Sequence, residues 1–198
     1  SIYYACGETV EKIEMLPQCD AIREKGYELL FLTENVDEFA LKMMNEYDGK
    51  TFVNICDDSL DLTTEDEKKA IEAENTDSKD MLEAMKEALG DAVNAVRFTS
   101  KLKNHPVCLT SEGGISIEME KTLNSMPGAS ENKVKAQTVL EINSEHPIAQ
   151  KLKSLYPDDK DTLTKYAKLL YAQGCLIGGK SVADPVEYSS LICELMVK

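Results

Sequence analysis

The 198-residue sequence contains only two histidines, no CxxC pair and no apolar run long enough for a membrane helix. His105 and His146 each precede a proline, and neither has clustered cysteine or carboxylate partners, so no metal site or nucleophile–base pair is indicated. The first residues, Ser1–Ala5, lack the basic start of a secretory signal. The sequence therefore predicts neither a metal site, a catalytic site nor a membrane span.

The cysteines are scattered instead of clustered. Because neither a disulfide framework nor a metal-binding spacing is present, the pattern favours reduced thiols that pack as small apolar side chains in a cytosolic protein. A redox role stays open for Cys175, which lies beside glycines. The six positions are 6, 19, 56, 108, 175 and 193.

Acidic residues outnumber basic ones, 36 to 22, and give a formal net charge of −14. Residues 1–90 carry the whole excess, since residues 91–198 hold 13 acids and 13 bases. Such a chain repels nucleic-acid phosphates, so DNA or RNA binding is disfavoured. The acidic part is expected to keep the molecule in solution; a docking surface for basic partners is the other interpretation.

The N-terminal part alternates between strand and helix signals. A short apolar run at Glu28–Leu32 is typical of a buried strand, and Thr33-Glu34-Asn35 supplies capping oxygens for a helix. Apolar residues then recur at helical spacing from Val36 to Met43; Asp48-Gly49 is expected to end this helix. Two further strands, at Ile2–Ala5 and Thr51–Ile55, and a helical segment to Arg23 complete the pattern. The order β-α-β-α-β predicts a small parallel sheet with helices packed on it.

The most polar segment marks the expected domain boundary, near Leu62. Thr64 with Glu67 forms a capping-box pattern, and a helix with one buried face follows from Asp77 until Gly90. This part is predicted to be a mixed α+β domain with a short sheet. Its strands are expected at Asn94–Ser100, Val107–Thr110 and Thr138–Ile142.

Residues Gly174–Ser181 match the phosphate-loop pattern GxxxxGK[ST]. That chemistry needs a strand before the loop and a helix directly after it, whereas Asp161–Gln173 has helical periodicity and Pro185 postpones the next helix. We therefore predict a helix–loop–helix connection whose glycines end the first helix. A small phosphate- or nucleotide-binding α/β protein that uses Gly174–Ser181 is the alternative function.

The last two helices carry more apolar residues than one face can hold. Either both faces pack within one core, or two copies of the chain form a dimeric four-helix bundle through an isologous interface. The pattern alone leaves both arrangements open. The residues assigned to such an interface are Leu163, Tyr166, Leu169, Leu170, Tyr188, Leu191, Ile192, Leu195 and Met196.

A short helix, Ser116–Ser125, lies between Gly113-Gly114 and Pro127-Gly128. Methionine is flexible and polarizable, so a face that carries it can adapt to varied apolar partners; an ordinary amphipathic helix on its own domain is the plainer interpretation. The apolar face is formed by Ile115, Met119, Leu123 and Met126.

Several segments resemble the heat-shock protein 90 chaperones of bacterial type, in the order expected for the end of their middle domain and their C-terminal domain. The resemblance covers nearly the whole chain. The segments are YYACGET (Tyr3–Thr9), GYELLFLTENVDEFALKMMNEYDGKTF (Gly26–Phe52), VRFTSKL (Val96–Leu102), HPVCLTSEGGISIEMEK (His105–Lys121) and LEINSEHPIAQKL (Leu140–Leu152).

This resemblance implies a non-catalytic C-terminal fragment, with residues 1–62 from the middle domain and residues 63–198 forming the dimerisation domain. It implies a homodimer and contact with unfolded client proteins by the face around Met119, without a cofactor in this fragment. ATP and magnesium would bind elsewhere in a cytoplasmic, stress-related parent chaperone. The C-terminal sequence lacks the EEVD and KDEL signals of eukaryotic members. A dimerisation module that holds no client is a third interpretation.

Overall fold

The computed structural model describes residues 1–128 and 133–197, and these residues form two compact units. Unit 1 comprises residues 1–62 and 110–138, and unit 2 comprises residues 63–109 and 139–198. The sequence predicts a single boundary near Leu62, with residues 63–198 in one domain, whereas the structure groups residues 110–138 with unit 1. Residues 110–138 group with the first 62 because the Ser111 amide donates to the Cys56 carbonyl over 3.0 Å, and the Asp58 amide donates to the Ser111 carbonyl over 2.9 Å.

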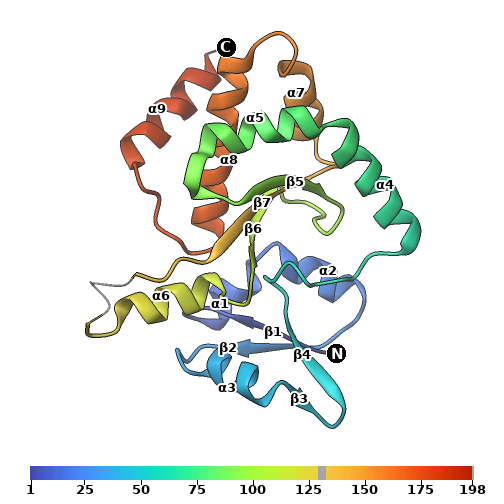
Figure 1. The fold of residues 1–198 in the computed structure, drawn as a ribbon, viewed down its shortest axis with the longest axis vertical. Coiled ribbons are helices and arrows are strands. Elements are labelled where there is room, and N and C mark those ends of the chain that lie inside the picture. The colour runs from blue at the N-terminus through green and yellow to red at the C-terminus, as the bar shows by residue number, and fades with distance from the viewer. Residues whose placement is uncertain (129–132, 198) are drawn as a thin grey trace. The chain divides into compact units, whose positions relative to one another are not determined.

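Unit 1 contains the parallel sheet that the sequence predicts (Figure 1). The strand order is β2-β1-β4-β3, with β1 parallel to both β2 and β4. Its buried core is formed by small and aliphatic residues such as Ile13, Ile22 and Ile55. The elements are β1 (Ile2–Cys6), α1 (Val10–Glu14), α2 (Gln18–Glu24), β2 (Leu29–Leu32), α3 (Asp37–Met44), β3 (Glu46–Tyr47), β4 (Lys50–Asn54) and α6 (Ile117–Ser125).

One sequence prediction in this unit is wrong. Asp48-Gly49 does not end α3, which stops at Met44 with Asn45 as its C-cap. The pair forms the turn between β3 and β4, which are antiparallel. Both turn residues have positive φ, 50° at Asp48 and 71° at Gly49, as the tight turns of two-residue hairpins require. An Asp-Gly pair is typical of a β-hairpin turn, so this pair indicates a hairpin and not a helix end.

Unit 2 is a mixed domain in which helices accompany a three-stranded sheet of order β5-β7-β6. Strands β5 and β7 are parallel, with Val96 opposite Leu140 and Phe98 opposite Ile142. The elements are α4 (Glu65–Asp77), α5 (Lys79–Leu89), the 3₁₀ helix η1 (Gly90–Ala92), β5 (Ala95–Thr99), β6 (Val107–Glu112), β7 (Gln137–Asn143), α7 (Pro147–Leu155), α8 (Lys160–Ile177) and α9 (Pro185–Met196).

The helix ends of unit 2 follow the local sequence. The capping box predicted at α4 is confirmed, because Thr64 and Glu67 each accept a hydrogen bond from the other's backbone amide. Helix α5 ends at Gly90, as predicted, and Asp184 caps α9 with Pro185 in the first turn. None of the helices in residues 1–128 and 133–197 is long and apolar enough to cross a bilayer.

Candidate functional site

Helix α6 is fixed at its first turn by Ser116. The Ser116 hydroxyl accepts a hydrogen bond from the Met119 amide over 3.0 Å and donates one to the carboxylate of Glu38 on α3. Two glycines precede the helix with positive φ, 76° at Gly113 and 87° at Gly114, so the turn that aims α6 is one that other residues rarely adopt. The cap therefore ties α6 to the parallel-sheet part of unit 1.

Glu38 is the buried centre of this contact. Its side chain is only 3% exposed, and the Asn54 amide nitrogen at the end of β4 donates to the carboxylate over 2.8 Å. A buried carboxylate is unfavourable unless it is hydrogen-bonded, so the donors from β4 and from the start of α6 are needed for stability. On the same helix, the Lys42 ammonium donates to the Gly114 carbonyl, which adds a second link to the α6 turn.

Burial is the main cause of the raised pKa values of the side chains near Glu38 and in the core of unit 1. Burial, and then the charge of Glu38, raises the pKa of the Cys6 thiol and of the Tyr4 hydroxyl well above their ordinary values. Burial also raises the pKa of Cys56, and raises the pKa of Cys19 to about 11. Thiols held protonated in this way are poor nucleophiles, so the cysteines of unit 1 are suited to packing.

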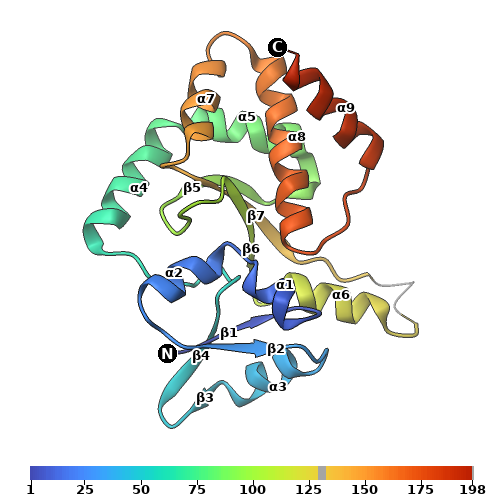
Figure 2. The ribbon, with the colours of Figure 1, turned by 180° about the vertical axis from the view of Figure 1, so that it is seen from behind.

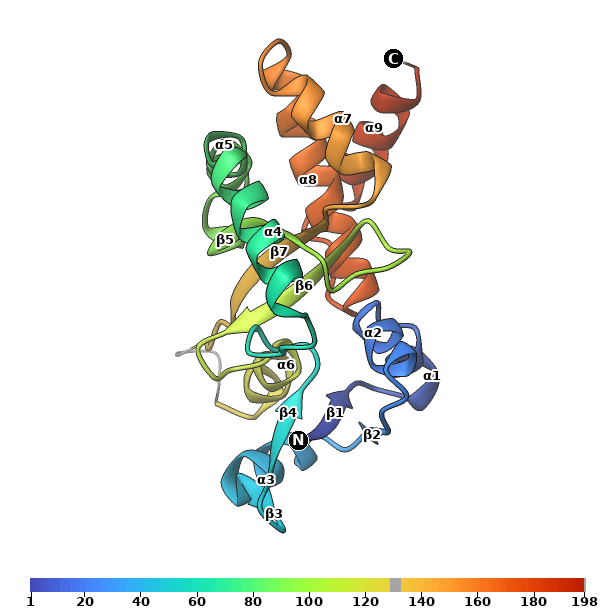
Figure 3. The same cartoon turned by 90° about the vertical axis from the view of Figure 1, so that its right-hand side faces the viewer.

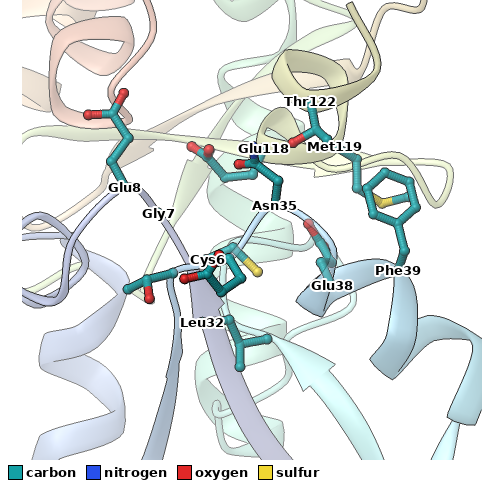
Figure 4. A pocket seen from close by; sticks show the side chains of 12 residues that line it. Cys6, Gly7, Glu8, Leu32, Asn35, Glu38, Phe39, Glu118, Met119 and Thr122 are labelled. Atoms are coloured by element: carbon teal, nitrogen blue, oxygen red, sulfur yellow. The ribbon is translucent and has the colours of Figure 1, made fainter. Parts of the chain in front are cut away.

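A small pocket lies where α6 meets the carboxyl ends of β1 and β2. Figure 4 shows Glu118, Met119 and Thr122 of α6 on one side of the pocket, with Cys6 and Leu32 on the other. Its volume is about 40 Å³, which is room for a few water molecules but not for a cofactor. Within the described residues, no group of three His, Cys, Asp or Glu side chains could hold a metal ion. The pocket is therefore the seam along which α6 packs on its unit.

The face assigned to client contact is partly covered in this chain. Ile115, Met119 and Leu123 are half-buried, whereas Met126, the C-cap of α6, is 48% exposed. Ile115 precedes the helix, which begins at Ile117. These residues thus line one side of α6, with the free surface concentrated at its C-terminal end.

The returning chain also contacts α6. The Asn124 side chain accepts from the Val134 amide over 2.9 Å and donates to its carbonyl over 2.7 Å, and Glu120 accepts from the Ala136 amide over 2.8 Å. No sequence pattern predicts these contacts, because a side chain that pairs with an irregular segment leaves no periodic signal. They leave α6 attached to unit 1 at both ends.

Helix α9 lies along α8 in unit 2 (Figures 2 and 3). Two ion pairs join the helices, Lys168 with Glu187 at 2.6 Å and Lys165 with Glu194. Hydrogen bonding and charge from Glu194 raise the pKa of Lys165. Because these pairs are at the surface, each adds little to stability and serves mainly to set the position of α9.

The nine residues assigned to a dimer interface fall into two groups. Leu163, Leu169, Leu170 and Leu191 are buried inside unit 2, where they hold the helices together. The others retain exposed surface, and Met196 is 79% exposed. The half-buried members are Tyr166, Tyr188, Ile192 and Leu195.

A second stripe on α9, which is not among the residues predicted for the dimer interface, is fully exposed. Val186, Ser190, Cys193 and Val197 are all exposed, with Val186 at 76% and Val197 at 86%. Their spacing of four, three and four residues places the first three on one face of α9, and Val197, the C-cap, follows on the same side. The missed signal was this spacing, which the larger side chains of the buried stripe obscured. The two central residues are small, so another helix could approach this face closely.

The phosphate-loop pattern does not form a phosphate loop. Helix α8 continues to Ile177, so the first four residues of Gly174–Ser181 are helical and no strand precedes them. The predicted helix–loop–helix connection is confirmed, because Gly178 is the C-cap of α8 and α9 begins at Pro185. Gly174, by contrast, lies inside α8 and does not end it. A Cβ on Gly174 would lie 3.1 Å from Cγ of Leu109, so this glycine allows α8 to pack closely against the sheet.

Comparison with known proteins finds relatives that match nearly the whole length of this chain. The family model described as "Hsp90 protein" matches residues 1–198. The chain is 49% identical over 195 residues to "Chaperone protein HtpG" of Clostridium perfringens (strain ATCC 13124), which covers 98% of the chain and 30% of that relative. Proteins of the same name from Natranaerobius thermophilus and Bacillus velezensis are 48% and 45% identical over 98% and 99% of the chain. The chain spans about a third of the length of these relatives, 31% in the latter two.

Proposed function

Because the chain belongs to the Hsp90 protein family, we propose that it is the part of an HtpG-type chaperone that joins two copies and adds client-contacting surface. In this proposal residues 1–62 are the end of a middle domain and residues 63–198 a C-terminal dimerisation domain. The identity of 45–49% over nearly the whole chain supports the chaperone assignment.

The observation that carries the dimer is the open stripe on α9. Val186 and Val197, at the two ends of the stripe, and Met196 next to Val197 are left largely exposed, and exposed apolar surface gathered on one element marks a site that a partner covers. A two-fold axis that crosses this stripe would pair α9 with the α9 of a second copy, and with α8 would form a four-helix bundle. The small Ser190 and Cys193 would then lie where the two helices cross.

The proposed mechanism is mechanical. Permanent pairing through α9 would hold two parent molecules together, so that their distant domains meet at high effective concentration. ATP and magnesium would be bound by those domains, and this stretch of chain would need no cofactor of its own. Stress response and a bacterial cytoplasm are the setting that this proposal implies.

The client surface is assigned to the exposed C-terminal end of α6. Leu123 and Met126 lie there beside the half-buried Met119, and flexible methionine side chains suit varied apolar segments. Attachment of α6 through Ser116 and Glu38 would keep this surface in place while leaving its C-terminal end accessible.

Molar mass in solution tests the dimer. We expect light scattering to give twice the 22.0 kDa chain mass, and Val186→Glu with Val197→Glu to reduce it to the chain mass without loss of helix content. Both side chains are exposed, so the substitutions should not disturb the core of unit 2. The matched control is Val36→Glu with Met43→Glu, two exposed apolar residues of unit 1 that should leave the mass unchanged. A wild type that stays monomeric at micromolar concentration would refute the tether.

A further inference from the structure

The free edge of strand β5 is the feature of unit 2 that the proposed function does not use. In the order β5-β7-β6, β5 is an outer strand with only β7 beside it. The Ser144 amide donates to the Thr99 carbonyl over 3.1 Å, so the backbone groups of Thr99 point toward the β7 side. Successive residues of a strand point their N–H and C=O groups to opposite edges. Those of Phe98 and Val96 therefore point away from β7.

Phe98 has its partner on this outer edge. The side chain of Asn75, on α4, accepts from the Phe98 amide over 2.8 Å and donates to the Phe98 carbonyl over 3.0 Å. One amide side chain thus makes the pair of hydrogen bonds that a neighbouring strand would make. It also closes the edge at this residue, so that any added strand must lie beside the earlier part of β5.

Val96 is the next residue on the same edge, and its backbone groups have no partner among the described residues. The residue itself is only 7% exposed, yet it lines an open groove of about 590 Å³. An unpaired N–H and C=O pair at a strand edge is a ready template for another extended chain.

The opposite wall of the groove is formed by two consecutive helices, α4 and α5. Figure 1 shows α5 beside β5, with α4 next to the end of the strand. Acidic and basic side chains alternate along this wall, and Arg97, which also lines the groove, is paired with Glu141. The groove is therefore close to neutral, although the chain as a whole carries −14. An uncharged extended segment would enter without the repulsion that an acidic one meets. The wall residues are Glu72, Asn75, Lys79, Leu82, Glu83 and Lys86.

We propose that this groove binds an extended, uncharged polypeptide segment by strand addition to β5, with Val96 exchanging two backbone hydrogen bonds with the bound segment. Main-chain pairing supplies affinity with little demand on sequence, which suits unfolded polypeptide. The identification of the occupant as a client segment rests on the proposed chaperone function. The site itself is independent of α6 and of the α9 interface.

Hydrogen exchange of the backbone amides, monitored by NMR, directly tests the pairing between Val96 and the bound segment. The probe is a short labelled peptide of alternating threonine and valine with a lysine at each end. We expect the Val96 amide to exchange freely in the free chain and to slow about tenfold or more at saturating peptide, while the Arg97 amide stays unchanged. A Val96 amide already protected without peptide, or unprotected when the peptide is bound, would overturn the proposal.

A control peptide and a control variant of the chain distinguish strand addition from non-specific binding. The same peptide with N-methyl groups on alternate residues cannot pair, and we expect it to bind about tenfold or more weakly. Val96→Pro removes the outward N–H, and it also replaces a buried side chain and restricts the backbone of Ala95, so its fold must be checked first. The folded variant should bind the unmodified peptide similarly weakly, whereas Val96→Thr keeps the N–H and should not weaken binding. Equal binding by both peptides, or by a folded Val96→Pro chain, would overturn the proposal. If Val96→Pro does not fold, the exchange measurement on the wild type decides. Failure here would leave the dimer and α6 experiments unaffected.

Discussion

The hydroxyl of Ser116 donates to the buried carboxylate of Glu38, which lies 78 positions earlier in the chain. One serine thus caps α6 and satisfies a charge in the parallel-sheet part of unit 1. Because both roles use the same oxygen, the position of α6 and the stability of the Glu38 site are linked. No pattern within either segment predicts this link, since each residue looks like an ordinary helix-terminal side chain on its own.

Ser116→Ala removes the cap and a donor to Glu38 together. We expect the free energy of unfolding to fall by about 1–2 kcal/mol, the range for a lost cap and a weakened buried hydrogen bond. Urea unfolding followed by circular dichroism measures it. Ser125→Ala, at the exposed other end of α6, is the control and should change stability by less than about 0.5 kcal/mol. Equal effects of both substitutions would contradict the link.

Most of the fold follows from local sequence. The alternation of strands and helices in residues 1–55 predicts the parallel pairing of β1 with β2 and β4, because such connections are right-handed and short. The capping box at Thr64 and the stop at Gly90 fix two helix ends for the same local reasons. The hairpin at Asp48-Gly49 was missed because β3 has only two residues, too few to show alternation.

The contacts around the candidate sites could not be predicted, because they join distant segments. Asn75 pairs with Phe98 across 23 positions, and Glu38 pairs with Ser116 across a longer span. Burial of Leu191 was equally invisible, since an apolar stripe does not reveal whether its own unit or a partner covers it. Sequence therefore identified the helices at issue and left their outward faces undetermined.

The client surface proposed at the exposed C-terminal end of α6 can be tested in the proposed full-length chaperone. We expect Leu123→Ser with Met126→Ser to reduce suppression of client aggregation several-fold, because serine removes apolar contact area from the exposed part of the face. Light scattering of an aggregating client protein is the measurement. Val36→Ser with Met43→Ser removes exposed apolar area from α3 and should leave suppression intact. Unchanged suppression in the α6 variant would refute this client surface.

Stability should fall in alkaline solution through Cys19. Its pKa is raised to about 11 in the folded chain, above the ordinary thiol value, so the unfolded state loses its proton first as pH rises. This contribution is present below the unfolded pKa and is lost as pH approaches 11. Between pH 8 and 10 we expect wild type to lose about 1 kcal/mol more than Cys19→Ala, by urea unfolding. Cys193→Ala, at an exposed site, should behave as wild type; a Cys19→Ala chain with the wild-type slope would contradict the assignment.

Cys193 offers a chemical test of the α9 interface. It is exposed on the open stripe, whereas Cys108 and Cys175 are buried in the same unit. If a two-fold axis crosses the stripe near Cys193, mild oxidation with a diazene reagent such as diamide should join the two thiols into one disulfide, reducing the diazene to the hydrazine. We expect a covalent dimer on non-reducing gels for wild type and none for Cys193→Ser. A cysteine placed at exposed Val10 in the Cys193→Ser chain controls for random collision, and equal cross-linking there would contradict the interface.

Gly174 separates the packing interpretation of the GxxxxGKS motif from the nucleotide one. Alanine favours a helix interior by about 1 kcal/mol over glycine, but here its Cβ would meet the buried side chain of Leu109 at 3.1 Å. Overpacking of this kind costs about 1–3 kcal/mol, so we expect Gly174→Ala to be destabilising on balance. Leu109→Ala alone leaves a cavity. In combination with Gly174→Ala it should relieve the crowding, so the double variant should lose less stability than the sum of the two single variants.

Calorimetric titration with ATP should show no binding to wild type. Additive losses would refute the close-packing role, and ATP binding that Lys180→Ala abolishes would restore the nucleotide interpretation.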